Sequence, residues 1–195
     1  MKKIILSLLL IINFSLIPVN SVHASNLNHY NEIIQEEYYN LFNDLKTMDK
    51  DYLEEWFLSY VELCDYYEID RETIDVIYSE EEIELMLRVI ETETYDCSFL
   101  QKVNVANVIL NRYQDYETFG YTNMVDLVTH SNQFAYSRTY ITEETKNALN
   151  FAFEIMDTTD NSIGFRSDKK VENWNNWEYA FYDGAHWFYK IRKEK

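Results

Sequence analysis

The sequence of 195 residues is poor in the residues that end regular structure. It contains only three glycines and one proline, Pro18. Sandwiches and barrels need a turn roughly every 8–12 residues, usually built with glycine or proline, so this scarcity argues against them and favours a helix-rich fold. Hydrophobic residues make up 47% of the chain, which is enough for a packed core and excludes wholesale disorder.

Basic residues and cysteines are also scarce. The chain has 17 Lys and Arg against 34 Asp and Glu. Because so anionic a surface does not attract phosphate groups, we expect neither nucleic acid nor an anionic membrane as a partner. The two cysteines, Cys64 and Cys97, exclude a disulfide-rich scaffold. They could pair in an oxidising compartment or remain buried thiols, and the sequence leaves both possibilities open.

Residues 1–24 have the features of a secretory signal peptide. Lys2 and Lys3 precede a mostly apolar stretch over residues 4–17, and Val22–Ala24 fits a small-x-small cleavage site. The apolar stretch is shorter than the roughly 20 residues of a membrane span. We therefore expect a cleaved signal and an exported protein, secreted or in the cell wall, with no stable membrane anchor after cleavage. A retained anchor is the alternative.

Most of the negative charge lies in the segment that follows. Residues 26–96 contain 21 Asp and Glu but only 4 Lys and Arg. Apolar residues at helical spacing predict two amphipathic helices, over about residues 27–46 and 51–67. We assign residues 25–78 to an acidic helical N-terminal extension. It either covers part of the core or docks a protein partner whose identity the sequence does not give.

The remaining chain, residues 79–195, is expected to form the main domain. A capping box, Ser79 with Glu82, begins its first predicted helix. The second, which follows Ser98, is apolar on nearly all faces and is expected to be central. Four helices and an irregular β segment are predicted over about residues 80–94, 99–114, 123–128, 143–157 and 162–191. The predicted fold class is α+β and predominantly helical.

Glu93 is the first candidate for chemistry. It takes the next position on an apolar helical stripe formed by Ile83, Met86 and Ile90. Burial and the negative end of the helix dipole would both raise the pKa of such a carboxyl, as a general acid requires near neutral pH. A structural glutamate bonded to arginine or to the backbone is the alternative interpretation.

Other patterns indicate less. Glu91 falls beside Arg88 on the outer face of the same helix, where a solvated ion pair is expected. The histidines that follow the signal lie far apart, so we expect no metal site. Neither a nucleophile elbow nor a phosphate-cradling glycine loop is present in the sequence, and no cofactor is expected.

Four segments together resemble a known family. They are residues 89–93 (VIETE), 103–112 (VNVANVILNR), 132–134 (NQF) and 183–189 (DGAHWFY). Their sequences, order and spacing are similar to those of the SleB-type cell wall hydrolases, the spore cortex-lytic enzymes and their vegetative relatives. Aligning the Asn-Arg pair without a gap places Glu93 on the catalytic glutamate of that family. Residues 79–195 are thus expected to be a cell-wall-hydrolase-like domain.

The resemblance implies a lysozyme-like core that cleaves peptidoglycan glycan strands between N-acetylmuramic acid and N-acetylglucosamine. It implies a lytic transglycosylase, in which Glu93 protonates the leaving oxygen. Glu93 then removes the proton of the C6 hydroxyl, and a 1,6-anhydro ring closes. The substrate-binding residues expected on the same basis are Gln133, Phe134, Tyr136, His186 and Tyr189, and no metal or cofactor is required.

Two alternatives stay open. A hydrolytic muramidase would use water as the acceptor, with Asp96 or another acid as the base. A non-catalytic, secreted cell-wall-binding or accessory protein could keep the same fold without activity.

Overall fold

The structure, a computed structural model, describes residues 50–66, 74–115, 120–131, 133–155, 157–172 and 177–192. The expected signal peptide and the expected helix over residues 27–46 lie outside them. The described residues all belong to one unit, Asp49–Lys195. Within these residues, no helix combines the length and the apolar character that crossing a membrane requires.

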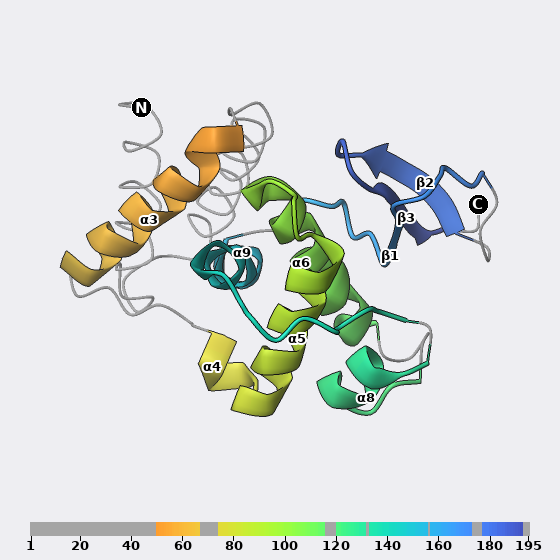
Figure 1. The fold of residues 1–195 in the computed structure, drawn as a ribbon, viewed down its shortest axis with the longest axis horizontal. Helices are drawn as coiled ribbons and strands as arrows, with labels where there is room; N and C mark the ends of the chain where they lie inside the picture. Colours follow the sequence, from red (N-terminus) through yellow and green to blue (C-terminus); the bar gives the residue numbers. More distant parts are fainter. Residues whose placement is uncertain are drawn as a thin grey trace, which may run out of the picture. The chain divides into compact units, whose positions relative to one another are not determined.

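Helices dominate the described residues, and a small sheet lies near the C-terminus (Figure 1). The elements are α3 (Lys50–Tyr66), α4 (Ile74–Ile77), α5 (Glu80–Glu93), α6 (Phe99–Gln114), α8 (Met124–Thr129), α9 (Glu143–Glu154), β1 (Gly164–Arg166), β2 (Trp177–Tyr182) and β3 (Trp187–Ile191). The predicted α+β, predominantly helical class is confirmed. The short helix α4 was not predicted, because four residues are too few to show a period.

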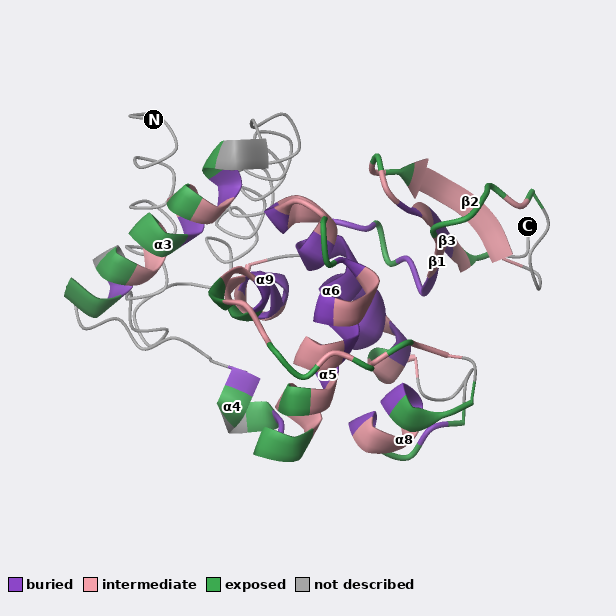
Figure 2. Cartoon of the chain, viewed as in Figure 1, coloured by how far each residue is buried: buried purple, intermediate pink, exposed green. Residues whose placement is uncertain are grey.

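Helix α6 is the centre of the packing. It contacts α3, α5, α8, α9 and β1, and every residue from Lys102 to Leu110 is buried (Figure 2). Apolar side chains occupy most of these positions, as the all-round apolar pattern predicted. The elements that contact α6 therefore cover different faces of this one helix.

Helix α3 packs against α6 and α9 through aromatic side chains. The Phe57 and Phe151 rings meet edge to face with centroids 5.4 Å apart, and Trp56 meets Phe151 at 6.2 Å. Phe57 is 2% exposed. Burying a large aromatic side chain of this kind contributes about 1.5–3 kcal/mol. This helix, expected in the acidic extension, thus shares its buried surface with the main domain.

Local sequence signals set the starts of the helices. Ser79 Oγ accepts a hydrogen bond from Glu82 N, and Glu82 Oε2 accepts one from Ser79 N at 2.9 Å, which completes the predicted capping box. Thr142 Oγ1 accepts from Thr145 N at the start of α9. These caps satisfy N–H groups that have no partner within the helix.

The sheet is antiparallel with the order β1-β3-β2. Phe165 of β1 pairs with Phe188 of β3, and Tyr179 of β2 pairs with Tyr189. The pairing shifts by one residue between Tyr179 and Phe181, so β2 bends there. Phe188 and Tyr189 are fully buried. Strand β3 is the central strand of the sheet, and β1 is the strand that contacts α6.

Replacing Gly164 by alanine is expected to lower the free energy of unfolding by about 1–3 kcal/mol, because the site has no space for a methyl group. A Cβ there would lie 2.5 Å from Trp177 Cζ3 and 3.3 Å from Arg112 Nη2. Urea unfolding followed by circular dichroism measures the change, with the exposed Ser167→Ala as control. An unchanged urea midpoint would show that the neighbours move aside at no cost.

Cys64 and Cys97 are both thiols in the structure, Cys64 buried in α3 and Cys97 half-buried before α6. Burial raises the pKa of the Cys97 thiol, and the charge of Asp183 acts in the same direction. The reactive thiolate is therefore disfavoured at Cys97.

Candidate functional site

An irregular segment, residues 133–142, runs along the C-terminal half of α5 and is bonded to it; we call this segment the latch. In Figure 1 it is the teal stretch that leads into α9. Three latch N–H groups donate to side chains of α5: Ala135 N to Glu93 Oε1 at 2.8 Å, Arg138 N to Thr92 Oγ1 at 3.0 Å, and Thr142 N to Glu91 Oε2 at 3.2 Å. Side-chain oxygens of α5 thus accept the latch N–H groups, as carbonyl oxygens of a neighbouring strand would in a sheet.

Glu93 ends α5 with its carboxylate half-buried against the latch. Oε1 accepts the Ala135 N–H, and among the described residues none donates a hydrogen bond to Oε2. One oxygen is therefore fixed in position while the other is available to a ligand. The expected core-facing position of Glu93 is wrong, because the buried residues of α5 are Met86, Val89, Ile90 and Glu91.

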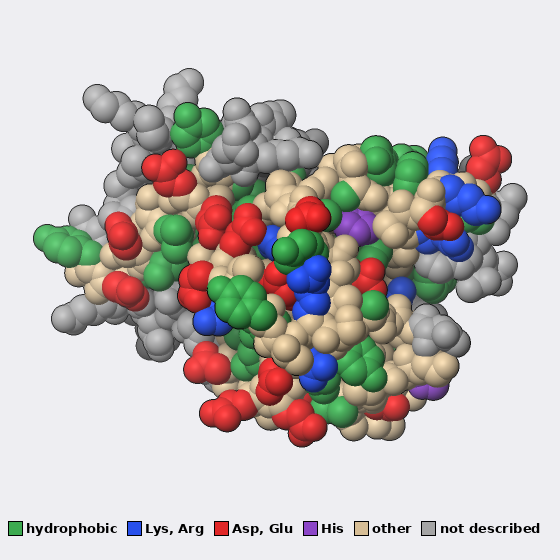
Figure 3. All heavy atoms as spheres, in the orientation of Figure 1, with side chains coloured by type: hydrophobic (Ala, Val, Ile, Leu, Met, Phe, Trp, Pro, Cys, Tyr) green, Lys and Arg blue, Asp and Glu red, His purple; other side chains and the backbone are tan. Residues whose placement is uncertain are grey.

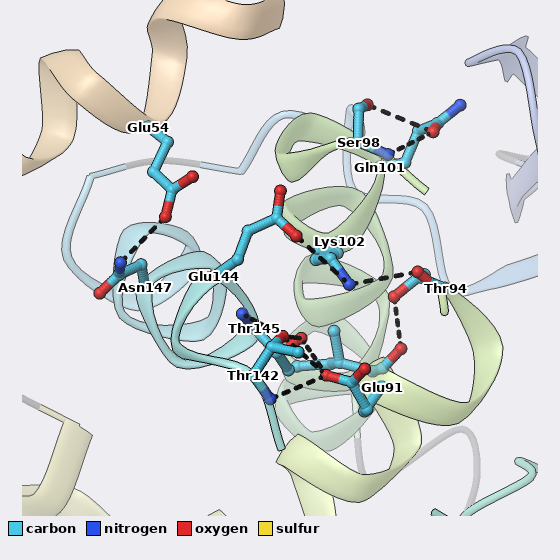
Figure 4. A network of polar contacts seen from close by, with 11 residues as sticks. Glu54, Glu91, Thr94, Ser98, Gln101, Lys102, Thr142, Glu144, Thr145 and Asn147 are labelled. Carbon is cyan, nitrogen blue, oxygen red and sulfur yellow. Dashed lines mark hydrogen bonds and ion pairs between the residues drawn. The ribbon is translucent and has the colours of Figure 1, made fainter. Parts of the chain in front are cut away.

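Glu91 takes the interior position instead, so the expected solvated ion pair at Glu91 is also wrong. Its residue is 1% exposed, and Oε2 accepts from Thr142 Oγ1 at 2.9 Å and Thr145 Oγ1 at 2.6 Å (Figure 4). Burial alone would raise the pKa of Glu91, but the hydrogen bonds from Thr145 and Thr142 and the charge of Lys102 outweigh it and lower the pKa. Glu91 is thus a buried, ionised carboxylate that joins α5 to α9.

The packing of α5 explains why Glu91 and not Glu93 is buried. The prediction from the apolar stripe treated α5 as packed against one neighbour, but α5 contacts both α6 and α9. The buried face is therefore wider than the stripe and shifted toward α9, where the threonine hydroxyls satisfy a carboxylate. Threonines distant in the sequence give no periodic signal on α5 itself.

Lys102, on α6, donates a hydrogen bond to the C-terminal end of α5. Its Nζ belongs to a side chain that is 1% exposed, and it donates to Thr94 O at 3.2 Å and lies 3.7 Å from Glu144 Oε2 (Figure 4). Thr94 directly follows Glu93 and caps α5. A buried ammonium group therefore fixes the backbone carbonyl next to the candidate acid.

Arg112, at the other end of α6, connects the latch to the sheet. Its Nη1 donates to Gln133 Oε1 at 2.9 Å, its Nε donates to Ile163 O, and its guanidinium carbon lies 4.6 Å from the centre of the Phe134 ring. Burial lowers the pKa of Arg112 to about 10, against the opposing charges of Tyr121 and Glu93. The guanidinium stays protonated at neutral pH and places positive charge near Glu93.

The contact with Arg112 also orients Gln133. An arginine carries only donors, so the amide oxygen of Gln133 must face it and the amide nitrogen must point elsewhere. No described residue accepts a hydrogen bond from that nitrogen. The two N–H groups of Gln133 are thus available to a ligand on the same segment that holds Glu93.

The predicted aromatic residues divide into two groups. Phe134 and Tyr136 are half-buried on the latch, on either side of the Ala135 N–H that bonds Glu93. Tyr189 is fully buried in β3, with its hydroxyl accepting from Val171 N at 2.7 Å. His186 is 2% exposed. The structure brings Gln133, Phe134 and Tyr136 together with Glu93. It buries His186 next to Phe165, and it buries Tyr189 against Tyr179 within the sheet.

His186 is connected to the latch through Phe165. The Phe165 ring lies 6.2 Å from Phe134 and 5.1 Å from the His186 imidazole. The His186 backbone N–H donates to Asp183 Oδ1 at 2.8 Å, while Nδ1 is 4.0 Å from the same oxygen. His186 thus supports the aromatic layer beneath Phe134.

Sequence reasoning missed the polar side of α6. Asn104 donates to Asp183 Oδ2 at 3.0 Å, Asn107 to Thr158 Oγ1 at 3.0 Å, and Asn111 to Ser162 O at 3.0 Å. These asparagines tie α6 to the loop before β1 and to the β2–β3 turn. Their spacing of three and four residues is visible in the sequence and could have indicated one polar face within the apolar helix.

Residues 98–189 match the family model described as cell wall hydrolase. The matched region contains the latch, β1, β2 and the first three residues of β3, and it begins after Glu93. No curated protein and no solved structure matches the chain. The family match supports a peptidoglycan-degrading, glycosidase-type role for this domain, while the narrower SleB-type assignment stays a prediction. Within the described residues, no three His, Cys, Asp or Glu side chains group as a metal site requires.

Proposed function

We propose that this protein cleaves the bond between N-acetylmuramic acid and N-acetylglucosamine in peptidoglycan, as a lytic transglycosylase with Glu93 as acid and base. The observation that carries the proposal is the geometry of Glu93, whose Oε1 is fixed by the Ala135 N–H while Oε2 has no partner among the described residues. The same latch presents Gln133, Phe134 and Tyr136, and it lies within the region matched to cell wall hydrolases.

In the first step, protonated Glu93 donates its proton from Oε2 to the glycosidic oxygen. The bond between C1 of the muramic acid and that oxygen breaks, and positive charge develops on the sugar ring. The carbonyl oxygen of the substrate's own N-acetyl group stabilises this charge. The buried, positively charged Arg112 guanidinium lies near the Glu93 carboxylate that this step leaves.

In the second step, the Glu93 carboxylate removes the proton of the C6 hydroxyl. O6 then bonds to C1 and closes the 1,6-anhydro ring, so that Glu93 regains its proton and no water is consumed. This chemistry needs one carboxyl group that is accessible. Glu91, the neighbouring acid on α5, is enclosed in the interior with Thr142 and Thr145 and therefore does not serve as a second acid for this chemistry.

The latch residues supply the contacts to the sugars. The free N–H groups of Gln133 suit the carbonyl oxygen of an N-acetyl group or a sugar hydroxyl. Phe134 and Tyr136 present ring faces on which sugar rings stack. His186 is buried next to Phe165, which lies next to Phe134 and so supports this ring from within the domain. We further propose that the chain is exported to the cell wall, where its substrate is found.

The products of digestion test this proposal. Purified protein is incubated with insoluble peptidoglycan, and the released fragments are identified by mass spectrometry. We expect muramic acid ends that are lighter by one water, the mark of the 1,6-anhydro ring. Release of no fragments would contradict the proposed activity altogether.

Hydrolysis is the second candidate, because Asp96 is exposed in the turn that follows Glu93. A muramidase could use this carboxylate as the base that activates water. Reducing ends, in place of anhydro ends, in the same experiment would decide for it, and Asp96→Asn should then abolish their release.

A further inference from the structure

Two arginines near the end of α5, Arg88 and Arg138, form no ion pair with any acidic residue that the structure describes. Yet the chain has twice as many acidic as basic residues. Both side chains are half-buried. Figure 3 shows basic side chains near the middle of one face, with hydrophobic and acidic side chains around them and further acidic side chains over α3 and the start of α5.

Each of these arginines lies over a tyrosine ring. The Arg138 guanidinium carbon is 3.3 Å from the centre of the Tyr95 ring, and that of Arg88 is 5.7 Å from the centre of the Tyr136 ring. Arg88 Nε also donates to Arg138 O at 3.2 Å. A guanidinium stacked on a ring keeps its N–H edge free for a planar anion such as a carboxylate.

The positions of Arg88 and Arg138 in the chain connect them to the candidate site around Glu93. Arg138 N is bonded to Thr92, the residue before Glu93, and Tyr95 follows Glu93 by one turn residue. The two stacked pairs therefore belong to the segments that also hold Glu93: the last turns of α5, the turn that follows it, and the latch. A ligand that binds along the latch to reach Glu93 can place an anionic substituent on this pair.

We propose that Arg88 and Arg138 bind a carboxylate carried by the muramic acid residue at the cleavage site, so that the enzyme selects muramyl-containing glycan over neutral glycan. This inference rests on the proposed function. The sugar rings of the glycan strand are uncharged, and its carboxylates belong to the lactyl group of muramic acid or to the peptide attached to it. Both sources offer the planar anion that the guanidinium groups recognise.

The test is calorimetric titration of full-length protein carrying Glu93→Gln, so that the ligands are not cleaved. Three oligosaccharides of equal length serve as probes: neutral N-acetylglucosamine oligomer, peptide-free glycan with free lactyl carboxylates, and glycan with peptide stems. We expect the carboxylate-bearing probes to bind at least about tenfold more tightly than the neutral one, with the difference falling as salt is added. Whichever anionic probe binds more tightly identifies the source of the carboxylate.

Arg138→Gln, added to the same protein, should remove the preference and leave binding of the neutral probe unchanged. The backbone N–H that bonds Thr92 remains in this variant. Lys146→Gln, which removes an equal charge from an exposed site on α9, is the matched control and should keep the preference. If Arg138→Gln fails to fold, the salt dependence and the ranking of the probes with the parent protein still decide the question.

Equal affinity for the three probes, no binding of any probe, or an unchanged preference in Arg138→Gln would overturn the inference. These outcomes are separate from a failure of the proposed function. Anhydro products with no carboxylate preference would leave the catalytic proposal standing, and a carboxylate preference without cleavage by the unaltered protein would leave a binding site but no enzyme.

Discussion

Replacing Glu93 by glutamine is expected to lower the rate of peptidoglycan cleavage by about 10²–10⁴-fold, the contribution that a positioned general acid makes. Glutamine keeps an oxygen that can accept the Ala135 N–H, so the latch stays bonded to α5. It has no proton to donate at the second position, and it cannot act as the base in the second step. The substitution therefore removes the chemistry and leaves the geometry in place.

The rate of muropeptide release from insoluble peptidoglycan measures this effect, and circular dichroism verifies the fold. Glu84→Gln, an equal change at an exposed position of the same helix, is the control and should retain the parental rate. Full activity in a folded Glu93→Gln protein would assign the acid to another residue. Glu93→Asp, which draws the carboxyl back by one methylene, should be slow but should retain some activity.

Replacing Glu91 by alanine is expected to lower the free energy of unfolding by about 3–5 kcal/mol, because it breaks a buried charged network and leaves its partners unpaired. Thr142 and Thr145 would lose the acceptor of their hydroxyl hydrogen bonds, and Lys102 would lose one of two nearby negative charges. Urea unfolding near pH 7 measures the loss, with Glu84→Ala as the control. A loss no larger than that of the control would contradict the network's contribution.

The pH dependence provides a second check on Glu91. Its pKa is lowered in the folded protein, so its stabilising contribution is present above the unfolded value of about 4.3 and is lost as the pH falls through the folded value. Glu91→Gln removes this titration. The difference in stability between the parent protein and Glu91→Gln should therefore narrow as the pH falls below about 4. A constant difference across that range would indicate that Glu91 is not ionised in the fold.

The two glutamates, two positions apart on α5, are thus expected to affect different properties: Glu93 the activity and Glu91 the stability. Glu93 is half-buried with one oxygen unoccupied, whereas Glu91 is enclosed and bonded to two threonines. A variant at Glu93 should be stable and inactive, and a variant at Glu91 should lose activity only in step with its loss of folded protein.

The helices could be predicted because their signals are local. The capping box of Ser79 and Glu82 defines the start of α5, and the predicted span 99–114 coincides with α6. Caps and apolar spacing act within one or two turns of the same helix, so the sequence near each end is sufficient. The β segment was predicted only as a region, since its strand order depends on pairing between distant residues.

The candidate site could be predicted only in part. The resemblance placed Glu93, Gln133, Phe134, Tyr136, His186 and Tyr189 in one site. The structure brings the first four together, whereas His186 and Tyr189 are buried. The burial of Glu91 could not be predicted from α5, because the hydroxyls that satisfy it belong to Thr142 and Thr145. Arg88 and Arg138 were missed for a similar reason. The sequence shows which charged residues are present, but it does not show which of them form ion pairs in the fold.

The hydrogen bonds that hold the latch on α5 do not use the side chains of the latch residues Ala135 and Arg138, so these side chains can be substituted without losing the bonds. The helix contributes side-chain acceptors, and the latch contributes backbone N–H groups from Ala135, Arg138 and Thr142, which every amino acid except proline can supply. Evolution or protein engineering can thus vary Tyr136, Arg138 and Tyr140 to retune ligand preference while the acid keeps its position. Proline is the exception: at position 135 it would remove the N–H that anchors Glu93, and at position 138 or 142 it would remove the bond to Thr92 or to Glu91.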